Sequence, residues 1–223
     1  PANETCGTAK TIQPGVTELV PLVGTAADVA TKCGPSTSDL VYRVVLDAPY
    51  DVRAYASTVD GAGSAVVSLR KDPCAGIETE VACFQGNPTS AFARKLGPGP
   101  VYVAVKASAP TDVSLLVTLE PPTDPPADET CASAPPLATN VDVPIDLKDH
   151  ADDVKTCVSG LVDAAYALTL DQPSDVLAIL RVSQADYGAL SIQKPPCESK
   201  DGVVGCKVSQ PSPMRVAAHG LPK

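Results

Sequence analysis

Histidine is scarce in this sequence: the 223 residues contain two, His150 and His219. Nucleophilic catalysis usually needs a base beside the nucleophile, and histidine is the side chain most often used. The chain also lacks a Gly-x-Ser-x-Gly elbow, a His-Glu-x-x-His pair and a glycine-rich phosphate loop. We therefore expect no enzymatic activity and no catalytic or cofactor-binding residues. Both histidines are predicted to be solvated residues of surface loops.

Clusters of basic residues and long apolar runs are missing too. The formal net charge is −9, and no group of Lys and Arg residues could neutralise a nucleic-acid backbone. An acidic surface is also repelled by anionic lipid headgroups. No apolar stretch approaches the ~20 residues that span a bilayer as a helix. The sequence thus predicts neither a nucleic-acid partner nor membrane insertion. Because the chain begins with Pro1 and shows no leader, we expect a processed or trimmed polypeptide.

Proline and glycine, in contrast, are abundant, with 23 and 15 copies. The apolar fraction of 44% is large enough for packed cores, although tryptophan is absent and aromatic residues make up only 4%. So many turn residues divide the chain into short pieces, which favours strands over long helices.

An internal repeat is the strongest signal in the chain. Ala-Asn-Glu-Thr-Cys at 2–6 returns as Ala-Asp-Glu-Thr-Cys at 127–131. Residues 39–52 return as 163–176, with the same Asp, Tyr, Leu, Asp, Pro, Asp and Val at matching places. Two copies of one structural unit are therefore predicted.

The eight cysteines follow the same period. Structural zinc sites usually contain cysteine pairs two to four residues apart, which this chain lacks, so we favour disulfides and an extracellular, cell-surface or periplasmic location. Three pairings per copy are open if the bonds stay within each copy. We favour 6–33 with 74–83, and 131–157 with 197–206, because the short pair would close one loop and the long pair would fasten the N-terminal segment. The cysteines of the two copies are Cys6, Cys33, Cys74 and Cys83, then Cys131, Cys157, Cys197 and Cys206.

The two copies are separated by a proline-rich stretch at 120–127, with four prolines in eight residues. Such a composition favours extended polyproline II, a semi-rigid spacer of about 25 Å at ~3.1 Å per residue. We expect a first domain at 1–119, this linker at 120–127 and a second domain at 128–223.

Apolar residues alternate with period two in short runs, which predicts strands. Tyr42, Val44 and Leu46 fall on one face of their run, and Tyr166, Leu168 and Leu170 do the same in the second copy. So many short strands predict an all-β fold of two tandem antiparallel β-sandwiches of jelly-roll type. The runs of the first copy are 18–22, 40–46, 51–57, 65–69, 91–96, 101–106 and 113–119.

These motifs carry a family resemblance. Asn/Asp-Glu-Thr-Cys, Asp-x-x-Tyr-x-x-x-Leu, Pro-x-Asp-Val, the late cysteine pair and Val-Tyr-Val-Ala-Val at 101–105 resemble bacterial pre-peptidase C-terminal domains, especially cysteine-containing tandem variants of myxobacterial secreted proteins. The match runs from Asn3 to Leu119, and Pro100 stands where the family has a glycine. The resemblance implies an extracellular β-sandwich accessory module, often attached to hydrolases and sometimes binding matrix polymers or calcium.

Carboxylates also recur at matching places in the two copies. Asp28 corresponds to Asp153, and Asp39 to Asp163. Clustered loop carboxylates can supply the six to eight oxygens that calcium prefers, so these four are candidate calcium ligands in a stabilising site. The alternative is that these Asp residues cap backbone amides in turns.

The second copy ends near the equivalent of residue 98, so its last two strands are expected to be missing. The open sheet edges that this leaves have three explanations: a longer chain, strands cleaved but retained, or a strand donated by a partner.

The sequence therefore predicts a non-catalytic module pair for adhesion, display or spacing on a bacterial surface. Two alternatives stay open: a structural or accessory subunit of an extracellular assembly completed by a partner strand, and an accessory-domain fragment of a secreted hydrolase. The expected partners are another protein or an extracellular polymer.

Overall fold

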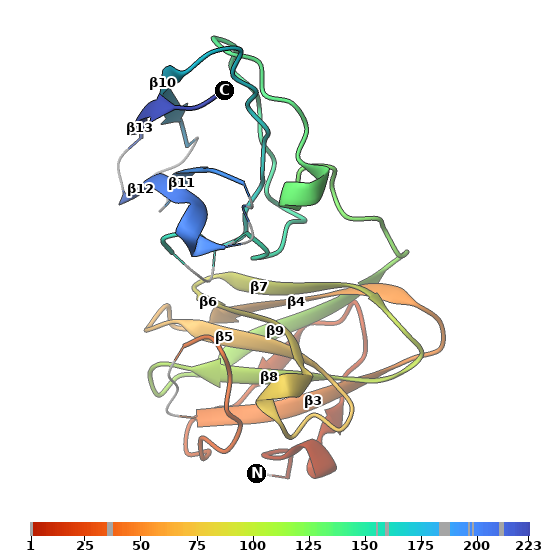
Figure 1. Ribbon diagram of the computed structural model, residues 1–223. Helices are drawn as coiled ribbons and strands as arrows, with labels where there is room; N and C mark the ends of the chain where they lie inside the picture. Colours follow the sequence, from red (N-terminus) through yellow and green to blue (C-terminus); the bar gives the residue numbers. More distant parts are fainter. Residues whose placement is uncertain are drawn as a thin grey trace. The chain divides into compact units, whose positions relative to one another are not determined.

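The chain folds into two units, Pro1–Asp124 (unit 1) and Pro125–Lys223 (unit 2), in the computed structural model (Figure 1). The boundary falls within the proline-rich stretch 120–127. None of the helices in the described part of the chain is long and apolar enough to cross a membrane. The structure describes residues 2–34, 38–154, 156–158, 161–182, 188–195, 197, 199–209 and 212–223.

Unit 1 is built from short strands with two single-turn helices. Each of the seven predicted runs corresponds to a strand, and the structure adds β1 and β6, which the sequence pattern did not predict. The elements are η1 (Cys6–Thr8), β1 (Lys10–Thr11), β2 (Glu18–Val20), β3 (Ser38–Leu46), β4 (Tyr50–Thr58), β5 (Ala65–Lys71), η2 (Ile77–Thr79), β6 (Glu80–Gly86), β7 (Thr89–Leu96), β8 (Gly99–Ala107) and β9 (Val113–Glu120).

The strands of unit 1 form a β-sandwich, as predicted (Figure 1). One sheet has the order β1-β3-β8-β5-β6 and the other β2-β9-β4-β7. Apart from the two-residue β1, the eight strands β2–β9 have the strand order of a jelly roll. Counted from β2, one sheet has the order first-eighth-third-sixth and the other second-seventh-fourth-fifth.

The core of unit 1 lies between the two sheets. Because alternate residues of a strand point to opposite faces, β3 buries Tyr42, Val44 and Leu46 there, as the sequence pattern predicted. Each buried aliphatic side chain of this kind contributes about 1.5–3 kcal/mol of transfer free energy. Small residues such as Ala54 and Ala56 on β4 face the same core and let the sheets approach closely.

The five-stranded sheet is buried on its other side as well, which we call the outer face. β5 and β8 alternate core residues with Ser68, Arg70 and Lys106, and these three are at most 4% exposed. The cover consists of two parts of the N-terminal segment (residues 2–34), namely residues 3–9 and 25–34, which hydrogen-bond to this sheet at several points. A sheet covered on both faces reads as nearly continuous apolar sequence, as Val-Tyr-Val-Ala-Val in β8 does.

Unit 2 repeats two of the antiparallel strand pairs of unit 1. β10 pairs with β13 and β11 with β12, as β4 pairs with β7 and β5 with β6. Residues 161–170, which align with β3, form no strand beyond a single bridge at Ala167, although Tyr166, Leu168 and Leu170 keep the expected alternation with exposed neighbours. The elements are η3 (Cys131–Ser133), β10 (Ser174–Leu180), β11 (Gly188–Gln193), η4 (Lys200–Gly202), β12 (Val203–Ser209) and β13 (Met214–Leu221).

Candidate functional site

All eight cysteines form disulfides within their own unit, as expected, but the favoured pairing is wrong. Cys83 lies on β6 opposite Ser68, so its side chain shares the outer face with that residue, and Cys74 is buried against the same face. Both therefore face the N-terminal segment and not each other. The bonds are Cys6–Cys74, Cys33–Cys83, Cys131–Cys197 and Cys157–Cys206.

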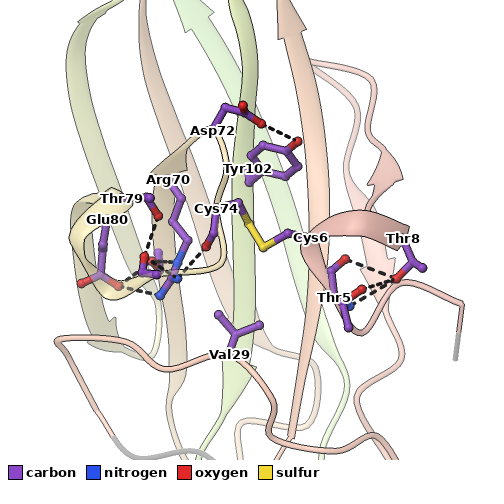
Figure 2. The surroundings of a disulfide bond; sticks show 12 residues. Thr5, Cys6, Thr8, Val29, Arg70, Asp72, Cys74, Thr79, Glu80 and Tyr102 are labelled. Atoms are coloured by element: carbon purple, nitrogen blue, oxygen red, sulfur yellow. Dashed lines mark hydrogen bonds and ion pairs between the residues drawn. A yellow bond between two sulfur atoms is a disulfide. The ribbon is translucent and has the colours of Figure 1, made fainter.

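The two disulfides of unit 1 fasten the N-terminal segment near both of its ends. Figure 2 shows the first: Cys6 reaches from η1 to Cys74, which is fully buried beside Val29 and Tyr102. The Tyr102 hydroxyl donates to Asp72 Oδ1 at 3.2 Å. Burial, reinforced by this bond, raises the pKa of Tyr102. The Cys6–Cys74 bond thus packs against apolar side chains of the outer face, next to the Tyr102–Asp72 hydrogen bond.

A buried ion pair holds the next part of the segment (Figure 2). Arg70 and Glu80 are 3.3 Å apart, and their side chains are 0% and 1% exposed. The Arg70 guanidinium also donates to the carbonyls of Ala30 and Cys74, while Glu80 accepts from the Lys32 backbone N–H at 3.0 Å. The charged side chains therefore satisfy backbone groups of loops that lie on the sheet without strand partners.

Asp39 and Lys106 form a second ion pair on this face, and both bind the backbone of the N-terminal segment. Asp39 Oδ2 accepts from Val29 N at 2.9 Å and lies 3.6 Å from Lys106 Nζ, which donates to the carbonyl of Val29. Burial raises the pKa of Asp39 and lowers the pKa of Lys106, so each charge is retained because the other is present. The pair and the backbone of Val29 form one closed hydrogen-bonded unit.

Unit 2 keeps only part of this polar layer. Gln193 and Val203 replace Arg70 and Glu80, so both members of that ion pair are lost together. Asp163 keeps the place of Asp39, and its carboxylate accepts from Val154 N at 3.2 Å. Burial is the main cause that raises the pKa of Asp163 to about 6. Its partners within the described residues are backbone N–H groups, and none of them carries a positive charge.

The four candidate calcium ligands differ in exposure and in their contacts. Asp39 and Asp163 are turned to backbone amides, whereas Asp28 and Asp153 are exposed. Across the described ranges no three His, Cys, Asp or Glu side chains form a metal-binding group. Calcium binding stays a prediction. Asp28 lines a pocket of about 260 Å³ beside the Cys6–Cys74 bond, together with Glu4, Thr5, Cys6, Gly7, Val29 and Ala75.

The histidine prediction is wrong for His150. Its ring is buried, and its Nε2 lies 3.0 Å from Asp128, which also accepts from the Tyr166 hydroxyl at 2.7 Å. Although burial acts in the opposite direction, these two partners lower the pKa of Asp128, while burial and the same bond raise the pKa of Tyr166 to about 12. The ring is oriented by an acid but is 6% exposed, so it is closed to a substrate.

His219 is exposed but lies on β13, not in a loop. Its Nδ1 is 3.0 Å from Asp175, whose other oxygen accepts from Gly220 N at 2.8 Å. The equivalent residue in unit 1, Asp51, also accepts a backbone hydrogen bond, from Lys95 N at 2.8 Å. Lys95 and Gly220 both have positive φ, at a bulge that each aspartate stabilises.

Asp51 also fastens the start of the proline-rich stretch. Its Oδ2 accepts from the backbone N–H and the hydroxyl of Thr123, at 2.9 and 2.5 Å. The next residue, Asp124, forms an exposed ion pair with Lys95. The first half of the predicted linker is thus bound to unit 1.

Comparison with known proteins finds no matching family model and no matching curated protein. Among solved structures, the chain is similar to the pre-peptidase C-terminal domain of a collagenase from Bacillus anthracis. The match has 18% sequence identity and a TM-score of 0.36, and it covers 49% of this chain and 94% of that one.

The first prediction concerns the disulfides. Replacing Cys6 and Cys74 by serine releases a bond that closes a 68-residue separation, and we expect the free energy of unfolding of unit 1 to fall by about 2–5 kcal/mol. Denaturant unfolding measures the loss. Peptide mapping without reduction should recover Cys6 linked to Cys74; a peptide pair joining Cys6 to Cys33 would contradict the arrangement.

The second prediction tests the buried ion pair by a double-mutant cycle. Arg70→Gln or Glu80→Val alone leaves one charge buried without its partner and should cost about 3–5 kcal/mol. The double variant carries the residues of unit 2 and should lose clearly less stability than the sum of the two single losses, as judged by chemical denaturation, because no buried charge is left without its partner. Glu18→Gln, at the exposed Lys10–Glu18 pair, serves as the control and should change little. Additive losses in the double variant would argue against the coupling.

The third prediction concerns pH. Burial raises the folded pKa of Asp163 to about 6, above the ordinary aspartate value of about 3.9, so its contribution to stability is full below about pH 4 and is lost as the pH rises through about 6. Asp163→Asn should therefore raise the melting temperature of unit 2 at pH 7.5 and change it little at pH 4, in calorimetric scans. Asp39→Asn is the matched control: it strands Lys106 and should lower the melting temperature of unit 1 at pH 7.5. Destabilisation by Asp163→Asn at pH 7.5 would refute the assignment.

Proposed function

We propose that this chain is a non-catalytic extracellular module pair that acts in adhesion, display or spacing on a bacterial surface. The observation that carries the proposal is the disulfide-fastened outer layer. In unit 1 both bonds join the N-terminal segment to the sandwich, and unit 2 repeats both bonds at the corresponding cysteines. Bonds of this kind persist in oxidising compartments and keep a small module folded there.

The charged groups of the interior support a non-catalytic role. Arg70, Glu80, Asp39 and Lys106 are buried and directed at the backbone of their own unit. A catalytic acid or base needs an open face toward a substrate, and these side chains are covered by the N-terminal segment. The resemblance of the sequence to pre-peptidase C-terminal domains, which are accessory modules, favours the same role.

Spacing is supported by the proline-rich stretch. Thr123 and Asp124 are bound to unit 1, and Pro125 and Pro126 are the first residues of unit 2, so the joint between the units is short and rich in proline. Prolines fix φ and favour an extended backbone, which makes such a joint stiff for its length. We propose that it holds two similar binding modules in sequence, so that weak contacts of each add up through avidity.

The fourth prediction tests adhesion. The full chain should be retained by at least one insoluble extracellular polymer, among peptidoglycan, bacterial envelope polysaccharide and fibrous protein, with saturable binding in a co-sedimentation assay. Reduced and alkylated chain is the control and should lose retention, because the outer layer then detaches. Soluble fragments released from the polymer would show catalysis and contradict the proposal. Failure to bind any of these polymers would contradict the adhesive role.

A further inference from the structure

The pair of Asp39 and Lys106 brings an amine and a carboxyl group together inside unit 1. Their side chains are 0% and 5% exposed, whereas those of the surface pair Lys95 and Asp124 are 51% and 89% exposed. In water at neutral pH an amine is protonated and a carboxylic acid is ionised, and the two ions do not condense. Burial removes the solvation that favours both ions. The Asp39–Lys106 pair is therefore open to chemistry that is closed to a surface pair.

Two strands and one residue of the N-terminal segment hold the pair in place. Asp39 on β3 lies directly opposite Lys106 on β8, in neighbouring strands of the five-stranded sheet (Figure 1). Lys106 Nζ lies 3.6 Å from Asp39 Oδ2 and donates to the carbonyl of Val29. The N–H of Val29 donates to the same Oδ2 at 2.9 Å. Two groups fixed side by side react as if each were very concentrated, because the entropy of bringing them together has already been lost.

The surroundings of the pair favour its neutral form. Burial is the main cause that raises the pKa of Asp39 and lowers the pKa of Lys106. The charge of Asp28 adds to the rise, whereas Arg70 and Glu80 act on Lys106 in opposite directions. The two pKa values lie closer together than in water, so transfer of one proton from the ammonium to the carboxylate costs less. The transfer leaves a carboxylic acid beside a neutral amine, the form in which a desolvated lysine is a nucleophile.

The two oxygens of the Asp39 carboxyl group have different surroundings. Oδ2 accepts from the N–H of Val29, a donor that also stabilises negative charge on this oxygen when a nucleophile adds to the carboxyl carbon. Oδ1 is buried and has no hydrogen-bond partner among the described residues. A buried oxygen without a donor is costly when it is charged, so the proton of the neutral acid belongs on Oδ1. Oδ2 is thus placed as the carbonyl oxygen and Oδ1 as the leaving hydroxyl.

The neighbouring pair of Arg70 and Glu80 shows why the lysine matters. It lies on the same outer face, and its side chains are buried to the same degree. A guanidinium keeps its proton in proteins and cannot attack a carboxyl group. The Arg70–Glu80 pair therefore stays ionic, whereas the Asp39–Lys106 pair has a reactive neutral form.

We propose that Lys106 and Asp39 condense after folding to an isopeptide bond that joins β8 to β3. The neutral Nζ of Lys106 attacks Cγ of Asp39, and the new Nζ–Cγ bond replaces the bond from Cγ to Oδ1. Oδ1 leaves as water, with its own proton and one proton from Nζ. Oδ2 becomes the amide oxygen and keeps the hydrogen bond from Val29 N, and the remaining Nζ–H keeps its bond to the Val29 carbonyl.

The reaction needs no oxidant, metal or cofactor, because one amine and one acid give one amide and one water. The product is a third covalent link on the outer face of unit 1, beside the two disulfides. Unlike the disulfides, an amide is not cleaved by thiols, so this link persists under reducing conditions. The inference does not depend on the adhesive role.

The fifth prediction is tested by the intact mass of the full chain after reduction and alkylation of its cysteines. Chain that has been kept folded at neutral pH should be lighter than its sequence mass by one water molecule. Proteolytic digestion should then release a branched peptide in which the side chains of Asp39 and Lys106 are joined, with no tryptic cleavage after Lys106. Chain purified and kept in denaturant should have the full mass, because β3 and β8 are not paired there.

Two matched variants make the test specific. Lys106→Arg keeps a positive charge beside Asp39 but has no amine, so it should have the full mass. Lys95→Arg, at the exposed pair, should keep the mass deficit. Loss of water to a succinimide at Asp60–Gly61 gives the same deficit, but it would persist in Lys106→Arg.

If Lys106→Arg does not fold, the branched peptide from the unmodified chain still decides. Folded chain of full mass that releases separate peptides with Asp39 and Lys106 would overturn the proposal, and so would a mass deficit that Lys106→Arg retains.

Discussion

The backbone of the N-terminal segment sets the constraint on which unit 1 depends. Residues 25–32 cross the outer face of the five-stranded sheet outside any strand, and the buried Val29 among them turns both its N–H and its carbonyl to that sheet. An unsatisfied buried amide or carbonyl costs roughly 1–3 kcal/mol, so the sheet must supply donors and acceptors. Asp39, Arg70, Glu80 and Lys106 do so, and each charge is matched by another. The disulfides of Cys6 and Cys33 then keep the segment in place at both ends.

That layer explains where prediction from the sequence succeeded and where it failed. Alternation in the short apolar runs, as in β3, predicted the sandwich, because the side chains between the two sheets obey a local period. The cysteine pairing is not local: Cys74 and Cys83 flank one loop, yet both face the N-terminal segment. Strand β6 was not predicted for the same reason. Its Cys83 side chain lies on the outer face, so polar and apolar residues do not alternate clearly along this strand. A two-sided sheet removes the polar positions by which an exposed strand is recognised.

His150 was mispredicted for a related reason. The sequence placed it in a loop, and loops usually expose polar residues. In unit 1 the corresponding loop turns inward at Thr25, whose hydroxyl donates to the Leu22 carbonyl at 3.0 Å. Unit 2 has the same turn, with His150 in place of Thr25, and the larger histidine ring is paired with Asp128. Asp128 stands where unit 1 has Asn3, and His150 stands where unit 1 has Thr25. The two differences between the copies therefore occur together, and both can be seen in the alignment of the repeats.

The recurring carboxylates are explained by the same demand for backbone partners. Glu4 and Glu129 accept from the amides of Ala26 and Ala151, and Asp39 and Asp163 from those of Val29 and Val154. These contacts are needed wherever the loop follows its path, so both copies retain them. The Arg70–Glu80 pair differs, because removing both charges together leaves neither one stranded. Unit 2 has done so with Gln193 and Val203 while keeping Asp163. What persists between the copies is therefore the set of carboxylates that accept from the loop amides, whereas the Arg70–Glu80 pair was replaced as a pair together with its own contacts to the backbone.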